Sequence, residues 1–379
     1  MEYRRLGRTE QKVSAIGLGC EHLDGKPFAQ VEETIRAALE GGVNIMDVFM
    51  PGTEVRENIQ KALGKQRGHV QIQGHIGSTN INQQYDISRD PAVIRRAFEE
   101  LLRLFGYIDY GMLFFIDTPK DYADVFETDF INYARQLKDK GDIRYIGFSS
   151  HNPETAMRVI ETGLVDMMMF SVNPAFDMLP SAAYVFDHIE TGFGADLFRG
   201  MDPTRALLYK LCAKNDIGMT AMKTLGAGKL LSREHTPYAE PLTAAQCVHY
   251  ALSRPAVASV LPGCQTADEM RDMLTYFSLS DKEKDFSRVI SGVRNDFMGQ
   301  CVYCGHCGPC PENIDIAAVN RYLDIALLNE QRIPPSIRAH YHHLQARGKD
   351  CTQCGQCETR CPFDVPVIEK MQQAECLIL

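Results

Sequence analysis

The residues with the clearest chemistry in this chain are its cysteines, because eight of the thirteen lie in two compact runs near the C-terminus. In each run the last cysteine is followed by proline. The second run has the spacing C-x2-C-x2-C-x3-C-P, which is typical of [4Fe–4S] ligation, and the first is one residue tighter before its last cysteine. The predicted cluster ligands are Cys301, Cys304, Cys307, Cys310, Cys351, Cys354, Cys357 and Cys361.

The two runs form an internal repeat, since the first three cysteines of the first run recur fifty positions later in the second. In two-cluster ferredoxins the fourth cysteine of each run ligates the other cluster. Two other uses of cysteine stay open. Structural zinc sites draw their ligands from two separated C-x2-C pairs, and disulfides belong to oxidising compartments. Three cysteines at two-residue intervals favour a cubane, so we expect two [4Fe–4S] clusters and electron transfer.

Composition and charge narrow the class of protein. The chain has 379 residues, a formal net charge of −9 and ordinary hydrophobic (45%) and charged (23%) fractions, which are typical of a globular protein. The acidic balance and the lack of a basic stripe argue against a nucleic-acid partner. No apolar stretch approaches the ~18 residues of a membrane span, and the first ten residues lack a signal-peptide core. We therefore expect a cytoplasmic protein that does not contact a membrane.

The first part of the chain alternates short apolar runs with amphipathic stretches of helical periodicity. Such alternation predicts parallel strands joined by crossover helices, and eight units in about 270 residues fit a (β/α)8 TIM barrel. An open doubly wound sheet is the alternative, although no G-x-G-x-x-G follows the first run. The eight expected strands cover residues 15–20, 44–48, 70–76, 111–117, 145–150, 167–173, 218–224 and 259–263.

The expected organisation is a barrel over residues 1–285 and a small ferredoxin-like domain over residues 286–379. Between the cysteine runs, residues 314–330 have helical periodicity. The fold class is therefore α/β, a (β/α)8 barrel followed by a small α-helical iron–sulfur domain.

Catalytic groups of such barrels stand at the carboxyl ends of the strands. Of the residues found there, Asp47 and His75 end neighbouring strands and are predicted to pair for proton transfer, and Lys223 to hold an anion or polarise a carbonyl. Hydrogen bonding within the barrel mouth is the alternative role of the Asp–His pair. The polar or reactive strand-end residues are Cys20, Glu21, His22, Asp47, His75, Asp117, Ser149, Ser150, His151, Asn173, Lys223 and Cys264.

Several motifs resemble the aldo/keto reductase family in their sequence and order. These are YRRLGRT and VSAIGLG near the N-terminus, GVNIMD at 42–47, YID at 107–109, IRYIGFS at 143–149 and LPG at 261–263. The resemblance covers nearly the whole barrel, and the tail resembles the ferredoxin-like extension of a bacterial branch of that family. It implies a (β/α)8 barrel and NAD(P)H-dependent carbonyl reduction.

The resemblance also implies a catalytic set of Asp, Tyr, Lys and His, of which only Asp47 is present. A turn containing Pro51 and Gly52 stands where the Tyr is expected, His75 replaces the Lys, and Phe114-Phe115 replaces the His. The tetrad is therefore degenerate and NAD(P) dependence uncertain. Ser149 fits the family's nicotinamide site, whereas Ser150 and Met169 replace its Asn and Gln. The predicted cofactor-binding residues are Ser149, Ser150, Asn173, Pro262 and Gly263.

Three functions follow from these residues. The first is an iron–sulfur oxidoreductase acting on a small carbonyl or hydroxyl compound, with a ferredoxin- or flavodoxin-type protein as redox partner. NAD(P)H and flavin stay open as further cofactors, because coupling a hydride to one-electron carriers normally requires a flavin or a radical. The alternatives are a non-redox lyase or isomerase that uses Asp47 and His75, and an electron-transfer or interaction subunit with an inactive barrel.

Overall fold

The computed structural model describes residues 1–81, 84–181, 183, 185, 201–291 and 298–378. The chain packs into two compact units. Unit 1 comprises Met1–Val172, Ile217–Thr224 and Val257–Ser278, and unit 2 comprises Asn173–Asp216, Leu225–Ala256 and Leu279–Leu379. This division follows packing and not chain order, so the predicted domain boundary at residues 285 and 286 stays a prediction.

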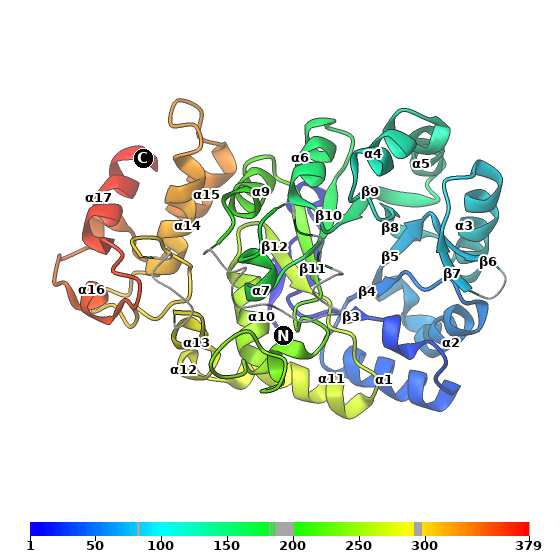
Figure 1. The fold of residues 1–379 in the computed structure, drawn as a ribbon, viewed down its shortest axis with the longest axis horizontal. Helices are drawn as coiled ribbons and strands as arrows, with labels where there is room; N and C mark the ends of the chain where they lie inside the picture. The colour runs from blue at the N-terminus through cyan, green and yellow to red at the C-terminus, as the bar shows by residue number, and fades with distance from the viewer. Residues whose placement is uncertain (82–83, 182, 184, 186–200, 292–297, 379) are drawn as a thin grey trace. The chain divides into compact units, whose positions relative to one another are not determined.

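Unit 1 contains a closed sheet of eight parallel strands (Figure 1). Bridges from Ile16 to Val260 and from Gly19 to Gly263 join its two edges and close the barrel. Each predicted strand overlaps one observed strand, which confirms the barrel, and the open doubly wound alternative is wrong. In spatial order the strands are β3 (Leu18–Gly19), β4 (Ile45–Val48), β5 (Gln71–Ile76), β8 (Ile108–Leu113), β9 (Ile143–Ser150), β10 (Met167–Ser171), β11 (Gly218–Met222) and β12 (Val257–Val260).

The helices of unit 1 follow their strands, and most have a clear start signal. Asp90 accepts from the backbone N–H groups of Ala92 and Val93, with proline at the first helical position, and Thr118 forms a capping box with Asp121. Their bounds are α1 (Phe28–Glu40), α2 (Thr53–Leu63), α3 (Pro91–Phe105), α4 (Pro119–Phe126), α5 (Asp129–Lys140), α6 (Pro153–Glu161) and α11 (Ala267–Leu274). Every helix in the described ranges is too short or too polar to cross a bilayer.

Two antiparallel hairpins accompany the barrel. The first joins β1 (Tyr3–Arg5) to β2 (Lys12–Ser14), and its Leu6 and Val13 belong to the same buried cluster as barrel residues such as Tyr110. At Gly218 a side chain is impossible, since a Cβ would lie 2.4 Å from the backbone carbonyl carbon of Leu6. The second joins β6 (Ser78–Ile81) to β7 (Gln84–Ile87), directly after β5. This hairpin lies outside the strands predicted from the sequence.

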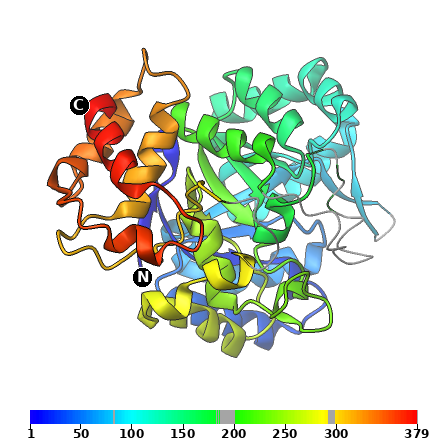
Figure 2. The same ribbon diagram turned by 60° about the vertical axis from the view of Figure 1, so that its left-hand side comes forward.

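The regular elements described in unit 2 are helices. Within the cysteine-rich segment, α14 (Ile316–Ala326) lies at the predicted 314–330 helix and packs side by side with α17 (Val367–Ile378) (Figures 1 and 2). The α-helices are α7 (Pro174–Asp177), α9 (Pro203–Lys214), α10 (Ala244–Ser253), α12 (Asp281–Lys284), α13 (Ser287–Ser291), α14 (Ile316–Ala326), α15 (Pro335–His342), α16 (Gln356–Arg360) and α17 (Val367–Ile378).

A buried carboxylate ties three of these helices together. Asp177, at the end of α7, is fully buried, and its Oδ1 accepts from Arg205 Nε at 3.0 Å and from the Tyr209 hydroxyl at 2.5 Å. Its Oδ2 accepts from the Tyr250 hydroxyl on α10 at 2.8 Å. Because a buried charge is tolerated only when it is paired and hydrogen-bonded, each member of this group depends on the others.

Replacing Asp177 tests that dependence. We expect Asp177→Ala to lower the free energy of unfolding by about 3–5 kcal/mol, because it removes the carboxylate that pairs with the buried guanidinium of Arg205. The exposed Asp268, which pairs with Arg271 on the surface of α11, provides the control, and Asp268→Ala should cost less than about 1 kcal/mol. Urea unfolding followed by circular dichroism measures both. Equal costs for the two variants would contradict the structural role of Asp177.

Candidate functional site

Asp47 and His75 form a buried pair on neighbouring strands of the barrel. Asp47 on β4 is in register with Gln73 on β5, so His75 lies two residues farther along, on the same side of β5 as Gln73. The distance from His75 Nε2 to Asp47 Oδ1 is 2.7 Å, and Gln73 Nε2 donates to the same oxygen at 3.0 Å. The structure therefore brings the predicted Asp–His pair into contact.

The surroundings of His75 define how its ring can act. A carboxylate only accepts hydrogen bonds, so Nε2 carries the proton in the neutral ring and Nδ1 is the acceptor. Nδ1 is buried and has no hydrogen-bond partner among the described residues. The ring of Phe114 meets the imidazole edge-on at 4.9 Å between centroids, and that of Phe49 does so at 6.0 Å. These apolar neighbours exclude water and strengthen the hydrogen bond to Asp47.

Lys223 lies elsewhere on the barrel rim. It directly follows β11, is half-buried and has a left-handed backbone with φ of 56°. The three strands β10, β9 and β8 separate β11 from β5, so Lys223 stands across the barrel from His75. The Asp–His pair and the lysine are therefore two separate features of one rim.

A second Asp–His pair joins the ends of β8 and β9. Asp117 Oδ2 lies 2.9 Å from His151 Nδ1, and Oδ1 accepts from the His151 backbone N–H at 2.6 Å and from the Ser150 hydroxyl at 3.1 Å. Burial alone would raise the pKa of Asp117, but the His151 ring and these hydrogen bonds hold it below its ordinary value. The ring of Phe115 is 5.3 Å from that of His151 and 6.0 Å from that of Phe114.

Asp117 and His151 are among the predicted strand-end residues, but the sequence does not predict that they pair. Asp117 lies four residues past the end of β8, where the path of the backbone is not set by strand periodicity. The proximity of β8 and β9 in a barrel was the one available signal. Aromatic rings, those of Phe114 and Phe115, lie between the two histidines.

The predicted nicotinamide residues use their polar atoms within the chain. The Ser149 hydroxyl oxygen accepts from the Phe115 backbone N–H at 2.9 Å. The Ser150 hydroxyl donates to Asp117, and Asn173 Oδ1 accepts from the Phe176 N–H as the cap of α7. Ser149, Ser150 and Asn173 are all buried. Their assignment to a cofactor stays a prediction.

The rim after β12 carries the other two predicted cofactor residues, Pro262 and Gly263. A Cβ on Gly263 would lie 2.4 Å from Cδ2 of the exposed His22 side chain, which would have to move to make room for it. The first turn of the following helix, α11, contains acidic side chains. Glu269 Oε2 accepts from the Gln265 N–H at 2.7 Å, and Asp268 lies in the same first turn. Negative charge at this helix N-terminus disfavours a phosphate there.

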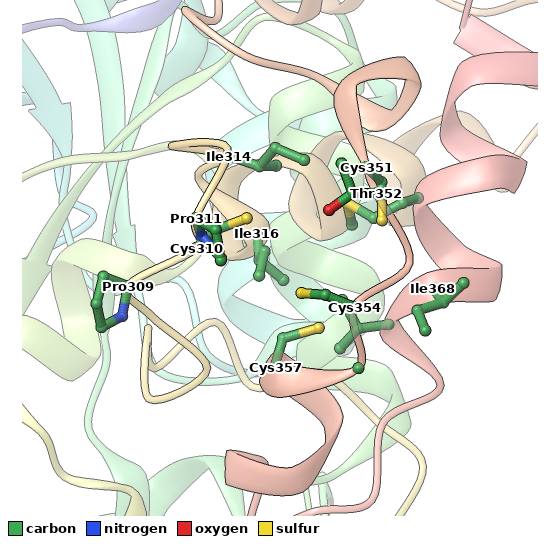
Figure 3. Close-up of a pocket in the computed structure, with 13 residues that line it drawn as sticks. Pro309, Cys310, Pro311, Ile314, Ile316, Cys351, Thr352, Cys354, Cys357 and Ile368 are labelled. Carbon is green, nitrogen blue, oxygen red and sulfur yellow. The ribbon is translucent and has the colours of Figure 1, made fainter.

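The eight cysteines of the two runs line two hollows, and each hollow combines three cysteines of one run with one cysteine of the other. Site A is lined by Cys310 from the first run and by three cysteines of the second (Figure 3). Site B is lined by the complementary set. The site A cysteines are Cys310, Cys351, Cys354 and Cys357, and the site B cysteines are Cys301, Cys304, Cys307 and Cys361.

The sequence repeat is also a repeat of backbone conformation. Tyr303 and Gln353, at matching positions of the two runs, both have φ of 58°. The matching glycines Gly305 and Gly355 have φ of 77° and 72°. Two left-handed residues per run turn the backbone sharply, which lets successive cysteines face one hollow.

The two sites differ in exposure. Cys354 of site A is exposed, whereas Cys307 of site B is buried. Burial raises the pKa of the Cys304 thiol to about 11 and that of Cys307 to about 12. Such thiols ionise near neutral pH only when a metal cation stabilises the thiolates.

Within the described ranges, no three His, Cys, Asp or Glu side chains group closely enough to hold a single metal ion. A four-iron cubane is larger than one ion and spaces its four cysteine ligands more widely. The donor set of each site, four cysteines around one hollow, fits a [4Fe–4S] cluster.

The sequence of this chain is similar to those of known proteins. The sequence model of the aldo/keto reductase family matches residues 15–243, so both cysteine runs lie outside that match. The chain is 26% identical over 286 residues to the uncharacterized oxidoreductase YqkF of Bacillus subtilis, covering 72% of this chain and 90% of that protein. It is 27% identical over 201 residues to L-galactose dehydrogenase of Arabidopsis thaliana, covering 48% and 61%.

Solved structures share the fold. The holo form of the aldo-keto reductase AKR11C1 from Bacillus halodurans aligns with a TM-score of 0.59 and 19% identity, covering 78% of this chain and 97% of that one. An aldo-keto reductase from Klebsiella pneumoniae in complex with NADPH aligns with a TM-score of 0.51 and 16% identity, covering 75% and 93%. At these identities the likeness concerns the fold alone.

Proposed function

Because this chain belongs to the aldo/keto reductase family and is an oxidoreductase, we propose that it exchanges electrons with its substrate through two [4Fe–4S] clusters. The substrate is a small carbonyl or hydroxyl compound in the barrel mouth. The observation that carries this proposal is the sharing of cysteines between sites A and B. Each hollow takes its fourth cysteine from the other run, as the ligands of two-cluster ferredoxins do.

When bound, the clusters would supply or remove electrons one at a time. Site A is the better place for exchange with a partner, because its Cys354 is exposed and electron transfer is fastest over short distances. A ferredoxin- or flavodoxin-type protein is the partner class that suits this chemistry. In site B the buried Cys307 favours a cluster that is better shielded from solvent.

The Asp47–His75 pair is the proposed proton donor and acceptor. Reduction of a carbonyl to an alcohol consumes two electrons and two protons, and the reverse reaction releases them. In its protonated form His75 can donate from Nδ1, while Asp47 holds the ring and stabilises the imidazolium through Nε2. In the oxidation direction neutral Nδ1 accepts the proton. The pair thus serves either direction of electron flow.

Two further groups on the rim support this chemistry. Lys223, across the barrel from His75, carries a charge that suits an anionic substrate group or a polarised carbonyl oxygen. The Asp117–His151 pair is a candidate source of the second proton, and its low Asp117 pKa keeps the carboxylate ionised to hold the ring. The aromatic rings between the two histidines offer an apolar surface for the body of the substrate.

NAD(P)H stays a proposed second cofactor. One aldo-keto reductase of the same fold is known in complex with NADPH. In this chain the first turn of α11 holds Asp268 and Glu269, and the hydroxyls of Ser149 and Ser150 bond within the barrel. With these residues we expect nicotinamide nucleotides to bind weakly, and NADPH to have no advantage over NADH from its 2′-phosphate.

Cysteine replacements test the clusters and their sharing. We expect Cys310→Ala and Cys354→Ala to remove the same cluster, leaving about four irons per chain instead of about eight, and Cys361→Ala to remove the other. Iron analysis and electron paramagnetic resonance of the anaerobically purified protein identify the remaining cluster. The control is Cys376→Ala, an exposed cysteine outside both runs that should leave both clusters. Full iron content in every variant would overturn the proposal.

Replacing His75 tests the proton-transfer role. We expect His75→Ala to lower kcat by about 10²–10⁴-fold with both clusters retained, because a positioned acid–base group contributes that much. The assay is the anaerobic reduction of a panel of small carbonyl compounds by reduced methyl viologen. His69→Ala, at an exposed histidine of the same unit, is the matched control. Unchanged turnover of His75→Ala would remove this residue from the mechanism.

The nicotinamide preference is a further prediction. We expect NADPH to bind no more tightly than NADH, because the carboxylates at the start of α11 repel the 2′-phosphate. Glu269→Gln should improve NADPH binding relative to NADH by about two- to fivefold. Calorimetric titration of both nucleotides measures this. A tenfold preference of the unaltered protein for NADPH would show that the phosphate binds elsewhere.

A further inference from the structure

Three arginines are buried in the described part of the chain, and one of them differs from the other two. Arg56, Arg205 and Arg254 are each at most 2% exposed. Arg56 has the carboxylate of Glu100 at 3.9 Å, and Arg205 has that of Asp177 at 3.0 Å. For Arg254 no carboxylate lies within ion-pair distance among the described residues. A guanidinium taken out of water without an anion carries a large desolvation cost.

The neighbours of Arg254 hold its guanidinium in a fixed place. It follows α10, and Nη2 donates to the backbone carbonyl of Val302 and, at 2.9 Å, to the hydroxyl of Ser253. The guanidinium lies over the ring of Tyr250 at 4.3 Å and near the ring of Tyr303 at 5.2 Å. Nη1 is buried and has no hydrogen-bond partner among the described residues.

The guanidinium of Arg254 lies next to the first cysteine run. Val302, which accepts its hydrogen bond, lines site B between Cys301 and Cys304. The charge of Arg254 acts on the Cys304 thiol and opposes the stronger effect of burial, which raises the pKa of that thiol. Asp285 acts on the same thiol with the opposite sign, and its own partner is the ring of His306.

We propose that Arg254 is the counter-charge of the site B cluster, a positioning residue that raises the reduction potential of this cluster relative to the same site without it. The inference rests on the proposed clusters. A [4Fe–4S] core with four thiolates is an anion in both of its common oxidation states, so it supplies the negative charge that Arg254 lacks. The additional electron of the reduced state is stabilised by a nearby fixed cation. Arginine suits this role because it stays charged when buried.

The effect should be confined to one cluster. Arg254 contacts the Cys301–Cys304 part of site B, and none of its described contacts lines site A. Arg360 provides a contrast, since it also donates to backbone carbonyls of the first run, those of Cys307 and Pro309, but it is only half-buried. Water screens its charge more strongly, so it should affect the potential less.

The experiment is a redox titration of the anaerobic full-length protein, with each cluster followed by electron paramagnetic resonance. We expect Arg254→Gln to disfavour reduction of the site B cluster at least tenfold, a shift of about 59 mV to lower potential for one electron. The site A potential should stay unchanged, Arg254→Lys should recover most of the shift, and Arg360→Gln should give a smaller one. An unchanged site B potential in Arg254→Gln would overturn the inference.

The failures of the two proposals are distinguishable. Absence of iron from the unaltered protein removes the clusters themselves, whereas two intact clusters with an insensitive site B potential remove only the role of Arg254. If Arg254→Gln loses the site B cluster, Arg254→Lys decides. Retention of the cluster in the lysine variant supports the counter-charge, and its loss there as well shows that the shape of arginine and not its charge is required.

Discussion

The exchange of one cysteine between the two runs is the constraint on which the C-terminal part of the chain depends. Site A cannot be completed without Cys310, nor site B without Cys361, although forty residues separate the runs. Those residues must therefore return the chain to its starting point. Helix α14, packed on α17, provides this return, and the left-handed residues at matching positions of both runs turn each run around its hollow. Neither site can form from one run alone, so both should form together.

A comparable constraint acts in the barrel, where parallel register brings side chains from neighbouring strands to one rim. Asp47 and His75 belong to β4 and β5, and Asp117 and His151 follow β8 and β9. Each pair thus joins adjacent strands, and each buried carboxylate is held by an imidazole together with other donors. Each of these buried carboxylates needs its paired donors, because an unpaired carboxylate in this position would be too costly to keep charged.

The sequence predicted the elements better than their contacts. Eight apolar runs located all eight barrel strands, and the Asp47–His75 pair was predicted because the two residues end neighbouring strands. The Asp117–His151 pair depends on a loop beyond β8, whose course no periodicity records. Arg254 could not be predicted either. An arginine at the end of a helix is ordinarily solvated, and only the packing around Val302 and Tyr303 reveals that it is buried. The serines predicted for a nicotinamide are present, but their hydrogen bonds within the barrel have no sequence signal.

Electrostatics offers one explanation for two departures from the family's tetrad, the missing tyrosine and the histidine at the lysine position. The resemblance implies a tyrosine that gives up a proton only because a lysine and an aspartate lower its pKa. In this chain the aspartate stays, and His75 takes the strand end where the lysine is expected. A histidine oriented by a carboxylate can both donate and accept a proton, so the role proposed for His75 would combine those of the tyrosine and the lysine. Such a pair transfers a proton independently of how the electrons arrive. That property is useful where electrons come singly from iron–sulfur clusters, since proton transfer then need not coincide with a hydride.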